Sequence, residues 1–324
     1  MKKILVTGGT GFIGSHLVEF LIQKNYCVTA FDRYNSENHW GWLENSKYKK
    51  DFNVILGDIR DYDSVNKAMK GFDVVFHLAA LIGIPYSYLS PMAYIKTNIE
   101  GTYNVLEASK NNKINQVIIT STSEVYGSAQ FFPMSEQHPL KAQSPYAATK
   151  IAADQLAISY CKSFDQNIKI IRPFNTFGPR QSARAIIPTI ISQIISKNSS
   201  IKLGNITPTR DYTFVENLCE AYLEIAKVSS LRGQIINVGS NFEISIKDLV
   251  NKLQKKLNTK KKIKCTSERK RKNTSEVDRL ICDNKKIFKK TNWKPKLSFD
   301  EGLDKTIGWI KNNPKLFKHN QYNV

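Results

Sequence analysis

Residues 3–14 read KILVTGGTGFIG, and this stretch decides the fold. The apolar run at 3–7 predicts a buried strand, and the amphipathic segment after the glycines predicts a helix. Gly8, Gly11 and Gly14 have the spacing of a dinucleotide-binding turn. In such a turn the first glycine makes the bend, the second lets the backbone approach a pyrophosphate, and the third lets the helix pack on the strand.

The rest of the first half repeats this alternation of strand and helix. Strands are predicted at 27–31, 53–56, 74–78, 116–121 and 168–172, and helices near 62–69, 95–111 and 146–164. Strands joined by helical crossovers predict an α/β fold with a doubly wound, Rossmann-type parallel sheet.

The pattern changes after Pro173. A loop is expected at 175–184, a strand returning to the sheet at 234–238, and helices at 186–197, 214–226, 246–257 and 299–311. These segments predict a smaller C-terminal α/β substrate-binding domain. The expected division is a nucleotide-binding domain of 1–173 plus about 207–238, and a substrate domain of about 174–206 plus 239–324.

Composition describes an ordinary globular protein of 324 residues, with 41% hydrophobic and 23% charged residues. No apolar run is long enough to span a membrane, and the three apolar residues after Lys3 are too few for a signal peptide. Five cysteines at wide spacings, with no CxxC, indicate neither a metal site nor a disulfide framework. We therefore expect a cytoplasmic protein without a metal.

The net charge is +20, and ten of the eighteen residues at 255–272 are Lys or Arg. Charge runs are usually solvated surface, and that interpretation is favoured here. A nucleic-acid partner is disfavoured because aromatic residues do not interleave with the lysines.

Two carboxylates follow predicted strands where a nucleotide cofactor would lie. Asp32 is 18 residues beyond Gly14, where a carboxylate holds both ribose hydroxyls and repels a 2′-phosphate, so NAD is favoured over NADP. The neighbouring Arg33 weakens that preference. Asp58, before Ile59, is expected near the adenine; the alternative is that Asp58 caps the next helix.

Tyr146 and Lys150 lie four residues apart and therefore share one face of a predicted helix. A nearby ammonium stabilises a phenolate, so we expect Lys150 to lower the pKa of Tyr146 toward neutrality and make it a usable base. The helix follows a strand that ends near Thr122, and ligands bind at the carboxyl ends of such strands.

At this point the chain resembles the extended short-chain dehydrogenase/reductase family, specifically its nucleotide-sugar branch. The resemblance rests on TGGTGFIG (7–14), HLAA (77–80), STSEVYG (121–127), YAATK (146–150), RPFNTFGPR (172–180), RDYTFVEN (210–217), SEVDRL (275–280) and NWKP (292–295). These motifs cover nearly the whole chain in the same order.

The resemblance implies that Tyr146 deprotonates a sugar hydroxyl while NAD takes a hydride from the same carbon. Lys150 would also bind the nicotinamide ribose, Thr122 would hydrogen-bond the reacting oxygen, and Asn98 would lie near the catalytic group. The implied cofactor-binding set is Gly8, Gly11, Phe12, Ile13, Gly14, Asp32, Arg33, Asp58, Ile59, Leu78, Ala79, Ala80, Tyr146 and Lys150. For His77 we prefer a satisfied core residue to a ligand.

The branch contains 4,6-dehydratases, decarboxylases and 4-epimerases, all of which first make a 4-keto sugar. Thr122-Ser123-Glu124 resembles the catalytic triplet of the dehydratases. Glu124 would remove the acidified hydrogen at carbon 5, whereas Ser123 is a poor acid for the leaving hydroxyl. UDP-glucuronate decarboxylases carry the same triplet, so decarboxylation and 4-epimerisation stay open. A catalytically silent NAD-binding regulator is a remote alternative.

Loop segments at 40–44, 84–88 and 178–194 resemble the 4,6-dehydratases of legionaminic-acid biosynthesis, which act on GDP- or UDP-linked N-acetylglucosamine. The expected substrate-binding residues are Tyr86, Ser87, Tyr88, Asn175, Arg180, Arg210 and Arg271. The arginines would contact the diphosphate. The family also suggests a homodimer through the helices near 95–111 and 146–164.

Overall fold

The computed structural model describes residues 2–270 and 272–317. Its main sheet has seven parallel strands in the order β10-β6-β5-β4-β1-β2-β3. The strands are β1 (Lys3–Thr7), β2 (Cys27–Arg33), β3 (Phe52–Gly57), β4 (Val74–His77), β5 (Gln116–Thr120), β6 (Ile168–Pro173) and β10 (Ile235–Val238). The strand order reverses between β1 and β4, so the predicted doubly wound Rossmann-type fold is confirmed.

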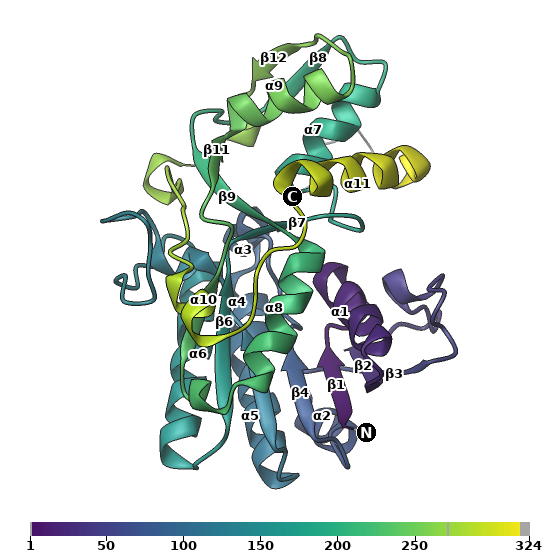
Figure 1. The fold of residues 1–324 in the computed structure, drawn as a ribbon, viewed down its shortest axis with the longest axis vertical. Coiled ribbons are helices and arrows are strands. Elements are labelled where there is room, and N and C mark those ends of the chain that lie inside the picture. Colours follow the sequence, from purple (N-terminus) through teal and green to yellow (C-terminus); the bar gives the residue numbers. More distant parts are fainter. Residues whose placement is uncertain (1, 271, 318–324) are drawn as a thin grey trace.

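Helices cover both faces of this sheet (Figure 1). They are α1 (Phe12–Gln23) and α8 (Val215–Lys227) on one face, and α2 (Tyr62–Ala68), α5 (Gly101–Asn111) and α6 (Pro145–Ser163) on the other. Successive residues of a strand face opposite sides, so Ile4 and Val6 of β1 pack in the core with α1 and α8, and Leu5 packs in the core with α2, α5 and α6. Burial on both faces explains why these strands are apolar throughout.

A smaller part stands above the carboxyl ends of the sheet (Figure 1). It contains a three-stranded sheet of β7 (Asn175–Phe177), β9 (Thr209–Phe214) and β11 (Glu243–Ser245), a pair of β8 (Ser200–Leu203) with β12 (Lys262–Cys265), and helices α7 (Ile186–Ile195), α9 (Ile246–Lys256) and α11 (Phe299–Asn312). The short helix α10 (Lys285–Lys290) lies beside β10. β7 falls where only a loop was expected, because three residues there pair with β9. The division into two domains stays a prediction.

The segment expected as one helix at 95–111 is not uniform. A π-helical turn at Ile95–Glu100 comes before α5, after two short helices, α3 (Ile84–Leu89) and α4 (Pro91–Tyr94). Within the wide turn, buried Asn98 bonds to the backbone N–H and carbonyl oxygen of Leu81 and to the hydroxyl of Thr149. The extra residue in the turn thus accompanies an inward-facing amide that ties the loop after β4 to α6. No helix among the described residues has the length and apolar character to cross a membrane.

Candidate active site

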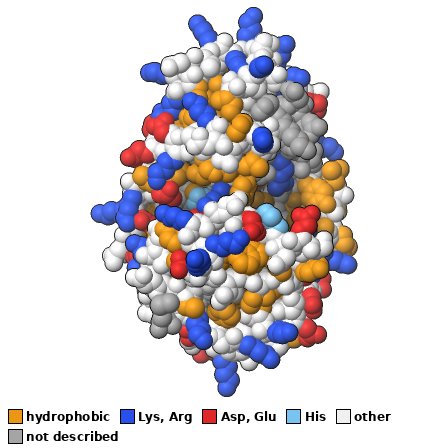
Figure 2. Space-filling model, turned by 90° about the vertical axis from the view of Figure 1, so that its right-hand side faces the viewer, with side chains coloured by type: hydrophobic (Ala, Val, Ile, Leu, Met, Phe, Trp, Pro, Cys, Tyr) orange, Lys and Arg blue, Asp and Glu red, His pale blue; other side chains and the backbone are white. Residues whose placement is uncertain are grey.

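A cavity of about 1420 Å³ runs from the glycine turn after β1 to the smaller part of the molecule. Its walls come from the carboxyl ends of β1, β2, β4 and β5, from the start of α6, and from the segments around β7, β8 and β9. Figure 2 shows one face of the molecule, hollowed across its middle, with Lys and Arg side chains spread over both ends. The predicted cofactor and catalytic residues meet at this cavity.

The glycine turn leaves no room for side chains. A Cβ on Gly14 would lie 2.0 Å from the Gly8 carbonyl oxygen, and one on Gly8, whose φ is +68°, would lie 2.8 Å from the Ala79 nitrogen. Gly11 stands at the N-terminus of α1 and has no side chain to cap it. The first turn of α1 therefore presents its N–H groups to the cavity, which suits a pyrophosphate.

Asp32 fixes the shape of this turn. One carboxylate oxygen accepts hydrogen bonds from the Thr10 N–H at 2.9 Å and from the Thr10 hydroxyl at 2.6 Å. The other accepts the Arg33 N–H at 2.8 Å. A carboxylate has about four lone-pair directions, so capacity remains for ribose hydroxyls on the cavity side.

Asp58 also lines the cavity, but it does not cap the helix that follows. The N-cap of α2 is Asp61, whose side chain accepts the Asp63 N–H, so the capping alternative for Asp58 is wrong. Asp58 instead forms an ion pair with Arg60 at 2.5 Å, which holds the pKa of the Asp58 carboxyl below its usual value. Arg60 is a cavity residue that sequence reasoning missed.

The remaining predicted cofactor residues also line the cavity, namely Phe12, Ile13, Arg33, Ile59, Leu78, Ala79 and Ala80. His77 lies behind them and is almost wholly buried. Its ring nitrogens bond to the hydroxyls of Thr7 at 2.7 Å and Thr102 at 3.1 Å. Burial, assisted by the charge of Lys150, lowers the pKa of His77 to about 3. His77 is therefore the satisfied core residue that we preferred.

Tyr146 and Lys150 lie on one face of α6, whose N-cap is Ser144. Both side chains are buried at the end of β5, and the Lys150 ammonium donates to the Thr120 carbonyl oxygen at 2.6 Å. Burial lowers the pKa of Lys150 to about 8, against the opposing charge of Asp154.

The predicted low pKa of Tyr146 is wrong for this structure. Burial raises the pKa of the phenol well above its usual value, and the negative charge of Glu124 adds to the rise. Only a hydrogen bond with Thr122 acts in the opposite direction among the leading causes. The Lys150 ammonium does not offset this rise in the Tyr146 pKa, because it is directed at the Thr120 carbonyl oxygen.

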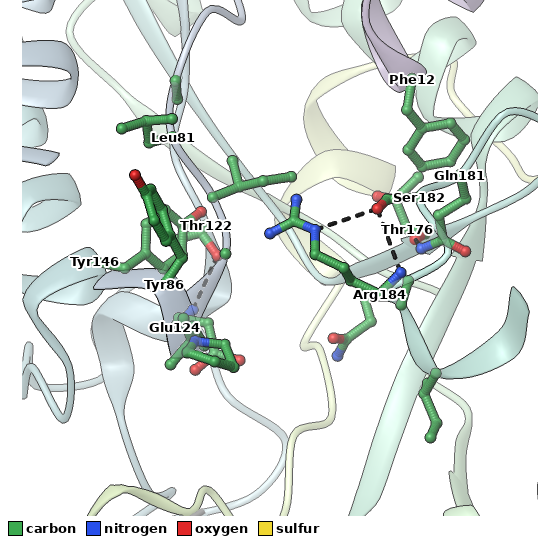
Figure 3. A pocket seen from close by; sticks show the side chains of 18 of the residues that line it. Phe12, Leu81, Tyr86, Thr122, Glu124, Tyr146, Thr176, Gln181, Ser182 and Arg184 are labelled. Atoms are coloured by element: carbon green, nitrogen blue, oxygen red, sulfur yellow. Dashed lines mark hydrogen bonds between the residues drawn. The ribbon is translucent and has the colours of Figure 1, made fainter. Parts of the chain in front are cut away.

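Thr122, Ser123 and Glu124 form the wall opposite the smaller part. Thr122 caps a short 3-10 helix at Ser123–Tyr126, and its hydroxyl accepts the Glu124 N–H at 3.2 Å. All three line the cavity with Tyr146. Figure 3 shows Thr122, Glu124 and Tyr146 on one side of the pocket. A hydroxyl, a carboxylate and a phenol therefore converge on one place.

Of the residues predicted to bind the sugar, some line the cavity and one does not. Tyr86 and Tyr88 of α3 line the cavity, but Ser87 does not. Ser87 is fully buried and donates to the Ile84 carbonyl oxygen at 2.7 Å. The segment is a helix rather than an extended loop, so a residue between two exposed neighbours can face inward. The prediction of Ser87 as a sugar contact is wrong for this reason.

The arginines predicted to bind the diphosphate also differ in whether they line the cavity. Arg210 lines the cavity and pairs with Glu276 at 3.2 Å, whereas Arg180 is not among the cavity residues and pairs with Glu19 of α1 at 3.0 Å. The structure thus turns Arg180 away from the expected diphosphate. Arg271 lies outside the described residues. Asn175 lines the cavity, and its buried side-chain NH₂ has no hydrogen-bond partner among the described residues.

Sequence reasoning also missed Arg184. Its guanidinium lies against the backbone of Gly83, where a Cβ would come within 2.1 Å of Nη1, and its Nε donates to the Ser182 hydroxyl at 3.2 Å. Figure 3 shows Arg184 between the Tyr146 side of the pocket and the Gln181 side. No carboxylate of residues 2–270 or 272–317 forms an ion pair with it. No sequence signal distinguishes it from the other arginines.

Comparison with known proteins gives consistent matches along the chain. The family described as GDP-mannose 4,6 dehydratase matches residues 5–306. A putative UDP-glucose 4-epimerase of Methanocaldococcus jannaschii is 31% identical over 96% of this chain and 99% of its own. The human dTDP-D-glucose 4,6-dehydratase is 29% identical over 100% of this chain and 93% of its own.

A solved structure is similar over the same length. The dTDP-glucose 4,6-dehydratase DesIV of Streptomyces venezuelae, solved with NAD bound, superposes with a TM-score of 0.90. It is 26% identical and covers 98% of this chain and 99% of its own.

Proposed function

The chain belongs to the GDP-mannose 4,6 dehydratase family, and from this premise we propose that it is an NAD-dependent 4,6-dehydratase of a nucleotide-linked hexose. The observation that carries the proposal is Glu124, a carboxylate that lines the same wall as Thr122 and Tyr146. Interconverting a hydroxyl and a ketone at carbon 4 needs, besides NAD, only the phenol of Tyr146 and the hydroxyl of Thr122. Dehydration also needs a base for carbon 5, and Glu124 supplies one.

The residues at the glycine turn fit NAD. The turn accommodates a pyrophosphate at the start of α1 because Gly8 and Gly14 allow no Cβ, and Asp32 keeps acceptor capacity for the ribose hydroxyls. A carboxylate at this place repels the 2′-phosphate of NADP. Lys150 would bind the nicotinamide ribose. When bound, NAD takes the hydride from carbon 4 and returns it to carbon 6, so the cofactor ends each turnover oxidised.

In the first step, Tyr146 takes the proton of the hydroxyl at carbon 4. Thr122 donates a hydrogen bond to that oxygen and stabilises the charge that develops on it. Because burial holds the Tyr146 pKa high, the phenolate is a strong base once formed, and positive charge in the site must favour its formation. Lys150 provides one such charge from the same face of α6.

In the second step, Glu124 removes the proton from carbon 5, which the ketone at carbon 4 has acidified. The hydroxyl at carbon 6 leaves with a proton as water. Ser123 is a poor acid, and so Glu124 donates the proton that it has just received. Carbon 6 then receives the hydride that left carbon 4. Carbon 5 takes up a proton, which balances the one that Tyr146 removed in the first step, and the products are the 4-keto-6-deoxy sugar and water.

For the substrate we propose GDP- or UDP-linked N-acetylglucosamine, from the resemblance of the loops at 40–44, 84–88 and 178–194. Arg210 and the Asn175 side-chain NH₂, which has no hydrogen-bond partner within the described part of the chain, are available to hold the diphosphate. Tyr86 and Tyr88 would face the sugar.

One observation favours a second candidate. Arg184 places a guanidinium in the same cavity, where its partner is the Ser182 hydroxyl and no carboxylate of the described residues pairs with it. A uronate substrate has a carboxylate at carbon 6, which a guanidinium would bind strongly. UDP-glucuronate decarboxylation or a 4-epimerisation is therefore the alternative reaction on this scaffold.

We further propose a homodimer through α5 and α6. Tyr103 of α5 and Phe164, at the end of α6, are 44% and 49% exposed, so these helices present apolar side chains outward. Sedimentation equilibrium at several concentrations tests this. A Tyr103→Lys variant should dissociate, and a monomeric wild type would refute the proposal.

The decisive experiment is mass spectrometry of products from GDP- and UDP-N-acetylglucosamine, UDP-glucose and UDP-glucuronate. We expect a product lighter by one water from at least one N-acetylglucosamine nucleotide. Loss of carbon dioxide from UDP-glucuronate, or a mass-neutral epimer, would replace dehydration by the corresponding alternative. Tyr146→Phe, which keeps the ring but removes the base, is the inactive control.

A further inference from the structure

A buried ion pair lies directly behind the catalytic groups, and the reaction described above does not use it. Asp154 follows Lys150 by one turn of α6, and Arg172 stands on β6. Their side chains are 0% and 1% exposed and 2.9 Å apart. Arg172 Nε also donates to the same Asp154 oxygen at 3.0 Å.

Two further bonds connect this pair to both ends of the catalytic triplet. Ser121, immediately before Thr122, donates its hydroxyl to Asp154 at 2.8 Å. Tyr126, two residues after Glu124, accepts a hydrogen bond from Arg172 Nη1 at 3.0 Å, and its ring lies under the guanidinium at 4.9 Å. The residues that carry the hydroxyl and the carboxylate are thus held at both sides by one charged pair.

The network also reaches β10 and has a second connection to β6. The Tyr126 hydroxyl donates to the Asn237 amide oxygen of β10 at 2.7 Å, and the Ser121 N–H donates to the Ile171 carbonyl oxygen of β6 at 2.7 Å. Because these hydrogen bonds hold both Ser121 and Tyr126, they restrict the position of the backbone between those two residues.

We propose that Asp154 and Arg172 are positioning residues for the reaction, holding Thr122 and Glu124 in register with Tyr146 and Lys150. The inference rests on the proposed function, although any reaction that uses the same phenol and ammonium would need the same register. A displacement of about 1 Å in such a site costs on the order of 100-fold in rate.

The carboxylate of Asp154 has a second effect, on charge. Lys150 faces Tyr146 and Asp154 of its own helix, His77 of β4, and the Thr120 carbonyl of β5. Two more charged groups, Glu124 and Arg172, lie around the same residues. Burial lowers the Lys150 pKa and raises the Tyr146 pKa, and the negative charge of Asp154 raises both. Removing that charge moves both pKa values downward.

If the ion pair served only to stabilise the fold, its replacement would change the stability of the protein but not the rate of the reaction. Replacing a buried ion pair by apolar residues of similar volume is often neutral or stabilising, whereas removing one partner leaves an uncompensated buried charge. The double variant Asp154→Leu/Arg172→Met therefore separates folding from catalysis.

For the NAD-loaded double variant we expect an unchanged or higher Tm, a kcat lowered about 100-fold with a much smaller change in KM, and the alkaline limb of the kcat–pH profile, which follows Lys150, moved to lower pH. Wild-type kcat with a wild-type pH profile would overturn the inference. Ile225→Ala, which opens a cavity under α8 away from the cavity residues, is the control for lost stability and should keep kcat at temperatures where it is folded.

Two single variants keep the inference testable if the double variant does not fold. Ser121→Ala removes the bond to Asp154, and Tyr126→Phe removes the bonds to Arg172 and Asn237. Both leave the ion pair in place, and each should lower kcat several-fold at unchanged KM. Wild-type kcat in both would overturn the positioning role.

A further measurement needs no substrate. The NMR titration of Lys150 in ¹³C-lysine-labelled protein, assigned with Lys150→Arg, should move to lower pH in the double variant. An unmoved titration refutes the charge effect. A wild type that converts no nucleotide sugar, with the titration moved as expected, refutes the proposed function alone.

Discussion

The Lys150 ammonium donates a hydrogen bond to the Thr120 carbonyl oxygen at 2.6 Å, and this contact joins the catalytic face of α6 to the end of β5. The ammonium is almost wholly buried, one helical turn from the phenol of Tyr146, and in the proposed reaction its positive charge favours the phenolate. The same burial makes that charge sensitive to pH, because the Lys150 pKa is lowered to about 8.

The rate should therefore fall as the pH rises through about 8. Lysine is charged below its pKa, so the ammonium that favours the Tyr146 phenolate and binds the cofactor ribose is lost on the alkaline side. A kcat–pH profile measures this. Lys150→Arg keeps the charge at all accessible pH values and should lose the alkaline fall, at a lower kcat. An alkaline limb shared by both proteins contradicts the assignment to Lys150.

Glu124→Gln tests the base for carbon 5. Without the carboxylate the proton at carbon 5 stays in place, so dehydration should slow by about 100-fold or more. Oxidation at carbon 4 does not need Glu124, so absorbance of enzyme-bound NADH should accumulate after substrate is added. Glu224→Gln, at the surface of α8, is the matched control and should behave as wild type. Full dehydration by Glu124→Gln would refute the role.

Gly14→Ala should abolish NAD binding. The added Cβ would lie 2.0 Å from the Gly8 carbonyl oxygen, so the turn and the start of α1 cannot keep their positions. Gly308→Ala in α11 is the matched control, since its Cβ would meet nothing within 4 Å and alanine stabilises a helix by roughly 0.5–1 kcal/mol over glycine. Isothermal titration with NAD compares the two. Equal affinities would show that the turn is not the cofactor site.

These glycines illustrate what a sequence determines well. The strand run at 3–7, the glycine spacing and the alternation of helices predicted the sheet, because burial on both faces and a turn without Cβ atoms leave few other residue choices. Tyr146 and Lys150 followed from helical spacing and from their place after a strand, and the role of Thr122 followed from the family resemblance.

What the sequence did not predict depends on side-chain partners. Arg180 was predicted to bind a phosphate, but it forms an ion pair with Glu19 of α1. Only the packing of the fold brings these two residues together. The predicted sugar contact of Ser87 is wrong because α3 is a helix that turns this side chain inward. The predicted low pKa of Tyr146 is wrong because the pKa depends on the depth of burial and on where the Lys150 ammonium is directed. Arg184 was missed because what distinguishes it, the lack of a carboxylate partner among residues 2–270 and 272–317, is visible only in the folded structure.

Stability should fall in mild acid because of two histidines. Burial lowers the pKa of His16 to about 4 and of His77 to about 3, so both stay neutral in the folded protein while the unfolded chain takes up protons below about 6.5. The unfolded state then binds more protons, and the unfolding free energy falls with pH by about 1.4 kcal/mol per pH unit for each histidine.

Urea denaturation between pH 6.5 and 5 measures that slope. His16→Gln should reduce it by the contribution of one histidine, since glutamine can still donate to the Pro179 carbonyl oxygen, which His16 Nε2 contacts at 3.0 Å. His39→Gln, at an exposed position, is the matched control and should leave the slope as it is. An identical slope in His16→Gln would contradict the assignment.

Arg210→Ala and Arg180→Ala make the same chemical change at two positions with different partners. Arg210 lines the cavity, so its loss should raise the KM for the nucleotide sugar by roughly 10-fold or more, the effect of about 1.5–3 kcal/mol for a hydrogen bond to a charged group. Arg180 pairs with Glu19, so Arg180→Ala should lower Tm and leave that KM close to wild type. Steady-state kinetics with thermal unfolding separates the two effects. A KM raised equally by both variants would return Arg180 to the diphosphate site, against the geometry of its ion pair.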